Sequence, residues 1–408
     1  MAPGRLIELE EARSRVLARV SPMDSEPVPL RQALGRRLAE DVAGEEPVPA
    51  FDNSAMDGFV LRAEDTSAAA PGAPVRLRLV DESRAGAPTA AALAAGEAMR
   101  ISTGAAVPAG ADAVLRVEEA RLENGHLLVE AAVAPRRDVR GAGEDVAPGT
   151  TVLTAGSSIS AAELGVLAAI GRPEVCCRRR PRVAVLTSGD ELVEPGEPLR
   201  PGAVRNSNAY SVPALAELAG AEVSVAGPAP DRPEATREAL APLLDTDVVV
   251  ACGGVSVGEH DHVKRALADL GVAEEFWGVA LKPGRPTWFG RRAETLVFGL
   301  PGNPVSAMVT FLLFVRPTLV ALGGGDPSRQ RTWARLASDY NKRPGRTHAL
   351  RCRLELREDG WWAHPFPRQG SHVLTSMVGA DCLALLPTES GPAAAGDRVE
   401  VELLEAWR

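Results

Sequence analysis

Apolar and polar residues follow two different periods along the central part of the chain. Residues 208–218 and 233–244 have the spacing of amphipathic helices, and Pro233 stands where the first turn of a helix tolerates proline. Short apolar runs around these helices predict buried strands, and they lie at 183–187, 222–226, 247–252 and 276–279. Strands that alternate with helices in this way require right-handed crossovers, so the pattern predicts an α/β domain with a mainly parallel sheet.

The flanking parts predict smaller units. Residues 6–20 carry apolar side chains at helical spacing, which predicts an amphipathic helix that either covers its own domain or lies on a partner subunit. Residues 51–135 break into short alternating segments, and strands at 349–356, 382–386 and 398–403 follow a glycine-rich linker, so both parts are expected to be rich in β-structure.

The fold class predicted from these patterns is multidomain. It has an α/β central domain with a mainly parallel sheet, a β-rich inserted N-terminal subdomain and a small C-terminal β domain that resembles a barrel. The expected boundaries are 1–50 with 136–178 for an N-terminal linker and helical domain, 51–135 for the inserted subdomain, 179–324 for the α/β domain and 328–408 for the C-terminal domain.

A glycine-rich turn follows the predicted strand 247–252 and carries the first candidate chemistry. It reads Gly253-Gly254-Val255-Ser256-Val257-Gly258-Glu259-His260-Asp261 and leads into a helix near His262. Backbone without Cβ atoms approaches an anion closely, and the N-terminus of the helix favours negative charge at the same point. Asp261 would repel a phosphate there unless a hard cation such as Mg²⁺ intervened. A plain strand-to-helix connection is the alternative interpretation.

Asp190 and Glu191 follow the predicted strand 183–187 and add two further carboxylates. Ligands in parallel sheets bind beyond the carboxyl ends of the strands, so both residues are expected on the same side as the glycine-rich turn. They are candidate metal ligands, with a solvated turn as the alternative. Zinc at His260 and His262 is disfavoured, because alternation in a loop lacks the fixed spacing of helical zinc ligands.

Stiff turns that carry cations predict a site for a compact oxyanion. Lys282 and Arg285 share the turn Lys282-Pro283-Gly284-Arg285-Pro286, and Arg346 ends a similar Pro-Gly turn. Proline and glycine hold such loops in place, so little entropy is lost when an anion binds. The segment Gln369-Gly370-Ser371-His372 offers hydroxyl and amide donors. Solvated surface charges remain the alternative for each turn.

Composition narrows the function without specifying it. The net charge of −9 disfavours non-specific nucleic-acid binding, so an anionic substrate would need positive charge concentrated locally. Five cysteines without a C-x-x-C pair predict a reducing compartment, and Cys252, within an apolar run, is expected to pack in the core. We find no apolar run near eighteen residues and no signal peptide, which predicts a cytoplasmic protein without a membrane segment.

Taken together, several long motifs resemble one family over nearly the whole chain. They are Phe51-Asp52-Asn53-Ser54-Ala55-Met56-Asp57-Gly58, Ser102-Thr103-Gly104-Ala105, Gly143-Glu144-Asp145, Ser188-Gly189-Asp190-Glu191-Leu192, the Gly253 and Lys282 turns, Leu300-Pro301-Gly302-Asn303-Pro304-Val305-Ser306 and Gln369-Gly370-Ser371-His372. In these the chain resembles the molybdopterin molybdenumtransferases, the MoeA family, to which the gephyrin E-domain corresponds.

The resemblance implies a reaction and a set of site residues. The expected enzyme is a transferase that inserts molybdenum from molybdate into adenylyl-molybdopterin, depends on Mg²⁺ and releases AMP with the molybdenum cofactor. The implied nucleotide and phosphate ligands are Asn208, Gly253, Gly254, Ser256 and Gly258. The implied Mg²⁺ ligands are Asp190, Glu191 and Asp261. The implied molybdate ligands are Lys282, Arg285, Ser306, Arg346 and Ser371.

Further residues and partners also come from the resemblance. Asp57, Thr103 and Asp145 match positions implicated in activity and are expected to reach the site across a homodimer interface, and Asp190, Glu191 and Lys282 complete the implied catalytic set. A cofactor-biosynthesis adenylyltransferase is a possible protein partner. Arg285 departs from the family, which often has a second lysine at this position. The change keeps the positive charge but replaces a compact ammonium group with a planar guanidinium group.

Two other functions stay open at this point. One is an adenylyltransferase-like or nucleotide-hydrolysing enzyme, since related α/β domains serve those reactions. The other is a gephyrin-like scaffold or cofactor carrier. The flanking regions that hold Asp57 and Arg346 favour the transferase, because an adenylylating homologue is expected to consist of the central domain alone.

Overall fold

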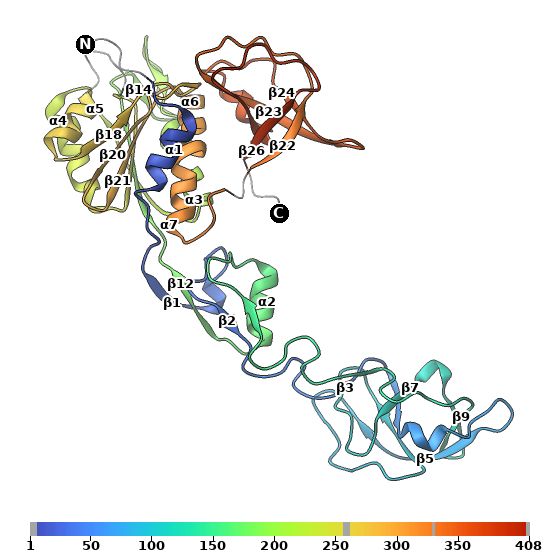
Figure 1. Cartoon of the computed structure of the whole chain (residues 1–408). Helices are drawn as coiled ribbons and strands as arrows, with labels where there is room; N and C mark the ends of the chain where they lie inside the picture. The colour runs from blue at the N-terminus through green and yellow to red at the C-terminus, as the bar shows by residue number, and fades with distance from the viewer. Residues whose placement is uncertain (1–5, 256–261, 329–330, 405–408) are drawn as a thin grey trace.

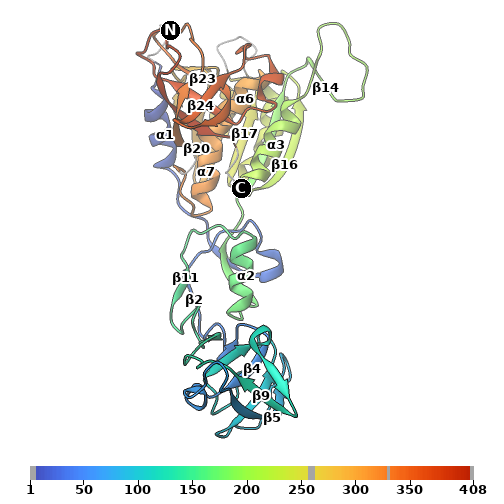
Figure 2. The ribbon, with the colours of Figure 1, turned by 90° about the vertical axis from the view of Figure 1, so that its right-hand side faces the viewer.

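The computed structural model describes residues 6–255, 262–328 and 331–404. The molecule is elongated (Figures 1 and 2). A central sheet with its helices lies beside the C-terminal strands at one end, and the strands between residues 53 and 129 form the other end. A narrow middle part, which contains α2 (Ala161–Ala169), joins the two ends.

The central sheet confirms the predicted α/β domain. Its order is β16 (Glu222–Ala229), β13 (Arg182–Ser188), β17 (Val248–Cys252), β21 (Thr295–Leu300), β20 (Trp288–Arg292) and β18 (Ala273–Trp277), and the first four are mutually parallel. Val248 and Val250 pack toward α3 (Asn208–Leu218), whereas Val249 packs toward α4 (Pro233–Leu240) and α5 (His262–Asp269). Strands buried on both faces need continuous apolar runs, and this is why the sequence pattern marked them.

One edge of this sheet differs from the prediction. β18 and β20 run antiparallel to their neighbours, and β20 returns into β21 through a tight turn in which Ala293 has a positive φ of 50°. The sequence analysis placed a strand at 276–279 and assigned no strands to the segment between Pro286 and Leu300. It missed this hairpin because a single alanine in a left-handed conformation leaves no glycine or proline to mark the turn.

The expectation of no apolar run near eighteen residues was wrong. α6 (Pro304–Thr310), η5 (Phe311–Val315) and α7 (Arg316–Leu322) form one continuous helix, which by length and composition is apolar enough to cross a membrane. Of its apolar window, 83% is buried inside the protein, so this helix lies in the core. Arg316 interrupts the run in sequence and donates to Glu402 at 3.0 Å.

The predicted amphipathic helix is α1 (Leu9–Leu17), and it covers its own chain. Leu9, Ala12 and Val16 pack into the same core cluster as α6 and α7. Arg13 is buried, donates from Nε to the Leu313 carbonyl at 3.0 Å and pairs with Glu402 of the C-terminal strands. α1 therefore ties the central domain to the C-terminal one.

The C-terminal strands confirm the predicted barrel-like domain. They are β22 (Arg331–Leu336), β23 (Thr347–Arg357), β24 (Gly360–Pro365), β25 (Cys382–Leu386) and β26 (Arg398–Leu403), and a pairing between β23 and β25 closes the circle. A short strand from the central domain, β19 (Leu281–Lys282), adds to β23. The barrel is thus attached to the segment that contains the predicted anion-binding lysine.

The N-terminal third supplies the middle and the far end of the molecule. In the middle, β1 (Ser25–Pro29) pairs with β12 (Glu174–Arg178), and β2 (Val42–Ala43) pairs with β11 (Thr151–Leu153). At the far end, β3 (Asn53–Ser54) pairs with β10 (Val139–Arg140). The main sheet there has the order β7 (Ala113–Arg116), β4 (Gly58–Leu61), β6 (Glu97–Ile101), β5 (Val75–Ser83), β9 (His126–Val129) and β8 (Arg121–Glu123). The division into four domains with fixed boundaries stays a prediction.

Candidate functional site

A cavity of about 720 Å³ lies beyond the carboxyl ends of the central parallel strands. The register pairs Thr187 with Cys252 and Cys252 with Leu300, so the turns that follow these three residues start level with one another. We call this the strand-end cavity. Its walls come from the segments 187–192, 204–208, 252–255 and 301–304 together with Asp231, Pro286 and His372.

Glycine backbone forms the floor of the strand-end cavity. Gly253 and Gly254 have positive φ angles of 97° and 63°. A Cβ on Gly253 would lie 2.9 Å from the Ser188 carbonyl oxygen, and one on Gly254 would lie 2.6 Å from Cγ2 of Val263. A side chain is therefore excluded at either position, and only backbone lines the cavity there. Ser256, Gly258, His260 and Asp261 of the same turn lie outside the described residues.

Three carboxylates gather on one side of this floor. The Asp190 amide donates to Asp231 Oδ2, and the Asp231 amide donates to Asp190 Oδ1, both at 3.3 Å. Glu191 folds its carboxylate over Gly189, where a Cβ would meet Oε2 at 2.5 Å. Glu191 and Asp231 line the cavity. The sequence analysis missed Asp231, because its place beside Asp190 depends on β16 lying next to β13.

This donor set fits a hard divalent cation in part. Mg²⁺ is usually bound by one or two carboxylates and takes its remaining ligands from phosphates and water. Over the described ranges, no group of three or more His, Cys, Asp or Glu side chains is placed to hold a metal ion by itself. Asp190, Glu191 and Asp231 thus suit an ion that arrives with, or is completed by, a phosphorylated ligand.

Buried polar side chains form a further part of the cavity wall. Asn206 donates from Nδ2 to Thr187 Oγ1 at 3.1 Å and to Glu194 Oε1 at 2.9 Å. Asn208 donates from Nδ2 to the Gly302 carbonyl at 2.7 Å. Sequence reasoning selected Asn208 and missed Asn206 together with Ser188, which also lines the cavity.

The predicted cations Lys282 and Arg346 lie around one buried histidine. Lys282 of β19 stands opposite His348 of β23. Burial, with the nearby charges of Lys282, Lys342 and Arg346, lowers the pKa of His348 to about 4. His348 is therefore neutral at pH 7 and accepts or donates only one hydrogen bond at Nδ1, which lies 3.2 Å from the Tyr340 hydroxyl. We call Lys282, Lys342, Arg346 and His348 the basic cluster.

One turn connects the basic cluster to the strand-end cavity, and a second loop borders the cavity. Pro286 ends the turn of Lys282 and Arg285 and lines the cavity. His372 lines it as well, and the carbonyl of its neighbour Ser371 accepts from the Val305 amide at 3.2 Å. Ser306 lies in the same first turn of α6 and is buried. None of the predicted molybdate ligands lines the cavity itself, and Arg285 and Ser371 directly precede the lining residues Pro286 and His372.

Arg351 is a buried residue that the sequence analysis passed over. Its Nε donates to Ser376 Oγ at 3.0 Å and its Nη2 to the Gly370 carbonyl at 3.2 Å, while Nη1 has no partner. Burial lowers its pKa to about 10. Gln369 is occupied in holding the same turn, since it exchanges hydrogen bonds with the Arg351 backbone. In sequence Arg351 looked like one polar residue of an alternating strand.

Asp57, Thr103 and Asp145 lie elsewhere. The Thr103 amide and hydroxyl donate to Asp57 Oδ1 at 2.7 and 3.1 Å, so two of the predicted residues meet. They belong to the end of the molecule that Figures 1 and 2 place opposite the central sheet. Asp145 stands in an exposed turn whose amide donates to the Val48 carbonyl at 2.9 Å. Within one chain these residues do not meet the strand-end cavity.

Cys252 behaves as expected of a core residue. It is 2% exposed at the end of β17, and burial raises its pKa to about 12. A thiol with so little thiolate at neutral pH is a poor nucleophile, so its place in the cavity wall gives no route to covalent catalysis.

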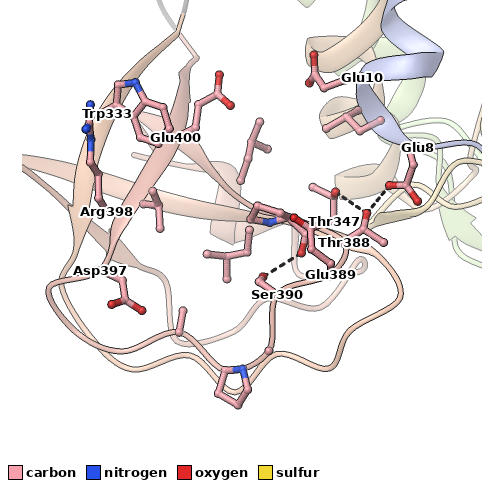
Figure 3. A pocket seen from close by; sticks show the side chains of 18 residues that line it. Glu8, Glu10, Trp333, Thr347, Thr388, Glu389, Ser390, Asp397, Arg398 and Glu400 are labelled. Atoms are coloured by element: carbon pink, nitrogen blue, oxygen red, sulfur yellow. Dashed lines mark hydrogen bonds between the residues drawn. The ribbon is translucent and has the colours of Figure 1, made fainter.

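A second cavity, of about 480 Å³, lies between the start of α1 and the barrel (Figure 3). Thr347, Thr388 and Glu8 form a chain of hydrogen bonds along one side. Arg398 lies over the ring of Trp333, 4.4 Å from its centroid. The remaining charged residues are all acidic, so we call it the acidic cavity: Glu8, Glu10, Glu389, Asp397 and Glu400. Its walls repel an anionic ligand.

Comparisons with known proteins cover nearly the whole chain. Family profiles described as "MoeA N-terminal region (domain I and II)", "Probable molybdopterin binding domain" and "MoeA C-terminal region (domain IV)" match residues 7–171, 184–321 and 333–404. The chain is 36% identical to the molybdopterin molybdenumtransferase of Haemophilus influenzae, over 97% of this chain and 98% of that one.

Other relatives are similarly close. The molybdopterin molybdenumtransferase of Bacillus subtilis is 34% identical, over 98% of this chain and 94% of that one. Among solved structures, a molybdopterin biosynthesis MoeA protein from Pyrococcus horikoshii OT3 superposes with a TM-score of 0.83 at 30% identity, covering 98% of this chain and 100% of that one.

Proposed function

The chain belongs to the molybdopterin molybdenumtransferase (MoeA) family, and on that premise we propose how its two neighbouring sites share the reaction. It is a transferase of molybdenum cofactor biosynthesis. In our proposal the strand-end cavity takes adenylyl-molybdopterin and the basic cluster takes molybdate, and metal insertion is coupled to release of AMP. The observation that carries this is the turn from Lys282 to Pro286, which begins beside His348 and its cations and ends in the wall of the glycine-floored cavity.

The diphosphate would lie over the glycine turn. Gly253 and Gly254 line the cavity with bare backbone, and the Gly254 amide would meet the phosphates, since the Gly253 amide already donates to the Leu300 carbonyl at 3.0 Å. Ser256 and Gly258 extend the same turn. Asp190 and Glu191, with Asp261 from the same turn as Gly258, would hold Mg²⁺ against the phosphates. When bound, this ion would neutralise charge on the diphosphate and on the departing AMP.

Molybdate would lie at the border between cavity and barrel. Lys282 and Arg346 contribute positive charge, Arg285 and Ser371 stand next to the lining residues Pro286 and His372, and Ser306 lies in the first turn of α6. His348 stays neutral beside them, so it neither adds to the repulsion among the cations nor competes for the anion as a charged group. Preorganised cations of this kind stabilise charge without reorganising during the reaction.

The position of Asp57, Thr103 and Asp145 supports a homodimer. They lie at the opposite end of an elongated chain, so a second copy would have to deliver them to the cavity of the first. We further propose that the protein acts in the cytoplasm and receives its substrate from the adenylyltransferase that makes it.

The decisive experiment measures AMP and finished cofactor together. The wild-type protein is incubated with adenylyl-molybdopterin and Mg²⁺, with and without molybdate. Release of AMP that requires molybdate and yields active cofactor supports insertion. Release of AMP without cofactor supports the nucleotide-hydrolysing alternative, and binding without turnover supports a carrier.

A further inference from the structure

Three buried polar atoms that belong to residues lining the strand-end cavity have no hydrogen-bond partner among the described residues. They are Ser188 Oγ, Asn206 Oδ1 and Asn208 Oδ1. The three residues are 9%, 2% and 8% exposed, so these atoms are buried in the cavity wall and not on the open surface. Native proteins pair nearly all buried polar atoms, and a group of unpaired ones in a cavity wall indicates a missing ligand. This observation is independent of the glycine turn and of the carboxylates.

The hydrogen bonds of the two asparagines decide which atom is free. Nδ2 of Asn206 faces the Glu194 carboxylate, and Nδ2 of Asn208 faces the Gly302 carbonyl. Both of these partners only accept hydrogen bonds. Turning either amide over would set two acceptor oxygens against each other, so the orientation is fixed. The free atoms of both asparagines are therefore acceptors.

Unfilled acceptors call for a ligand that donates hydrogen bonds. Phosphate and molybdate oxygens are acceptors, and the carboxylates of Asp190, Glu191 and Asp231 are as well. An amino group or a ring N–H of a heterocycle is a donor, and a substrate with an adenine and a pterin carries such groups at two places. The wall of Asn206 and Asn208 thus complements a ring edge and not a diphosphate.

Resting on the function proposed above, we propose that Asn206 and Asn208, assisted by Ser188, determine specificity by binding the amino-bearing edge of a heterocycle in the substrate. The assignment narrows the role of Asn208, which the resemblance implied as a ligand of the nucleotide and its phosphates, to the ring. It also gives the loop after Glu191 a role in recognition, because Asn206 lies at its end.

Glu194 acts as a positioning residue in this arrangement. Its Oε1 accepts from Asn206 at 2.9 Å and its Oε2 from the Tyr210 hydroxyl at 2.8 Å. Its carbonyl accepts from Arg205 at 2.7 Å, which fixes the loop backbone. Glu194 holds the Asn206 amide in place without lining the cavity, so its removal should loosen discrimination and leave the acceptor present.

Matched pairs of analogues test the proposal on the intact protein. Dissociation constants are measured for AMP against purine riboside monophosphate, which lacks the amino group, and for pterin against lumazine, in which an oxo group replaces it. The wild type should favour the amino compound in one pair by roughly tenfold to a hundredfold, and that pair identifies the ring that is bound. Asn206→Leu and Asn208→Leu should each bring the two members of that pair to the same affinity.

A serine pair controls for general disturbance. Ser211 also has a buried unpaired hydroxyl but does not line the cavity, so Ser211→Ala should leave discrimination intact while Ser188→Ala reduces it. Thermal unfolding confirms that each variant is folded. Equal affinities within both pairs for the wild type, or discrimination that survives in both leucine variants, would overturn the proposal. Molybdate-dependent AMP release is recorded alongside, and its absence in the wild type counts against the proposed function, whichever analogue is preferred.

Discussion

The strand-end cavity measures about 720 Å³ and the acidic cavity about 480 Å³, so both have room for a small organic ligand. Their walls differ in chemistry. The first has glycine backbone, buried unpaired polar atoms and, at Pro286, the end of the turn that carries Lys282, whereas the second has five carboxylates and an arginine held over Trp333. Two cavities of one chain with a net charge of −9 thus differ in their local charge, and net charge alone does not reveal where an anion binds.

The largest effect is predicted for the removal of Lys282, the cation whose turn ends in the wall of the strand-end cavity and which the acidic cavity lacks. Lys282→Gln should lower AMP release at limiting molybdate by about 100-fold, because one preorganised charge is lost where the anion binds. Nucleotide affinity, measured by calorimetry with AMP, should stay unchanged. Arg121→Gln removes a cation from the far end of the molecule and serves as the control. Equal activity of the two variants at low molybdate would remove Lys282 from the site.

The next effect concerns pH and the neutral histidine of the basic cluster. His348 has a pKa of about 4 in the folded protein and about 6.5 when unfolded, so only the unfolded chain takes up its proton between these values. Its contribution to stability is complete above pH 6.5 and is lost as the pH falls through 4, up to about 3 kcal/mol.

His348→Gln isolates this contribution. The free energy of unfolding, followed by urea titration from pH 7 to pH 4, should fall less steeply in the variant than in the wild type. Bound molybdate should also raise the pKa of His348, which can be followed by NMR of its ring protons. Identical pH profiles for the two proteins would show that His348 already carries a proton in the folded state.

A smaller effect tests the glycine floor. Gly254→Ala forces an alanine to φ 63° and brings its Cβ to 2.6 Å from Val263, so it should destabilise the protein by about 1–3 kcal/mol and weaken AMP binding. Gly271→Ala imposes a similar φ of 79° with nothing within 4 Å, so it measures the backbone strain alone. Should the two variants bind AMP equally well, the floor is not a close contact of the ligand.

The smallest effect is expected in the acidic cavity. Glu389→Gln removes an exposed carboxylate from its wall, and AMP release should change by less than about twofold, since exposed charges contribute little. Steady-state assays at saturating and limiting molybdate check this. A large loss at either concentration would mean that the acidic cavity takes part in the reaction.

Local sequence patterns were sufficient for the parts of the site that are continuous in sequence. The Gly253 turn and the turns of Lys282 and Arg346 were found because glycine and proline mark special backbone at the turn itself. Asn206, Asp231 and Arg351 were missed for a shared reason. The residues next to each of them in sequence form no motif. Their roles depend on contacts with residues distant in the chain, such as that of Asn206 with Glu194 and that of Asp231 with Asp190.

The fold shows the same division. Apolar runs identified the parallel strands and α3, whose bounds Asn208–Leu218 the sequence gives directly. The antiparallel edge was missed because its hairpin turn is formed by an alanine and not by glycine or proline. The long helix that begins at Pro304 was missed because Arg316 interrupts its apolar sequence and because a buried helix lacks an amphipathic pattern. Asp57 is separated from the cavity by the middle part of the molecule, which contains α2. The amino-acid composition does not predict how far apart this part holds the two ends.

The two-residue strand β19 has a mechanical consequence. Leu281 and Lys282 belong to the central domain by sequence, yet they hydrogen-bond as an outer strand of the barrel, where they pair with Thr347 and His348. If the barrel rotates relative to the central sheet, either this strand pairing breaks or Lys282 moves with the barrel. Lys282 is therefore attached to the central domain by the chain and to the barrel by the strand pairing. Any hinge between the two domains has to lie in the segment just before Leu281 or just after Lys282.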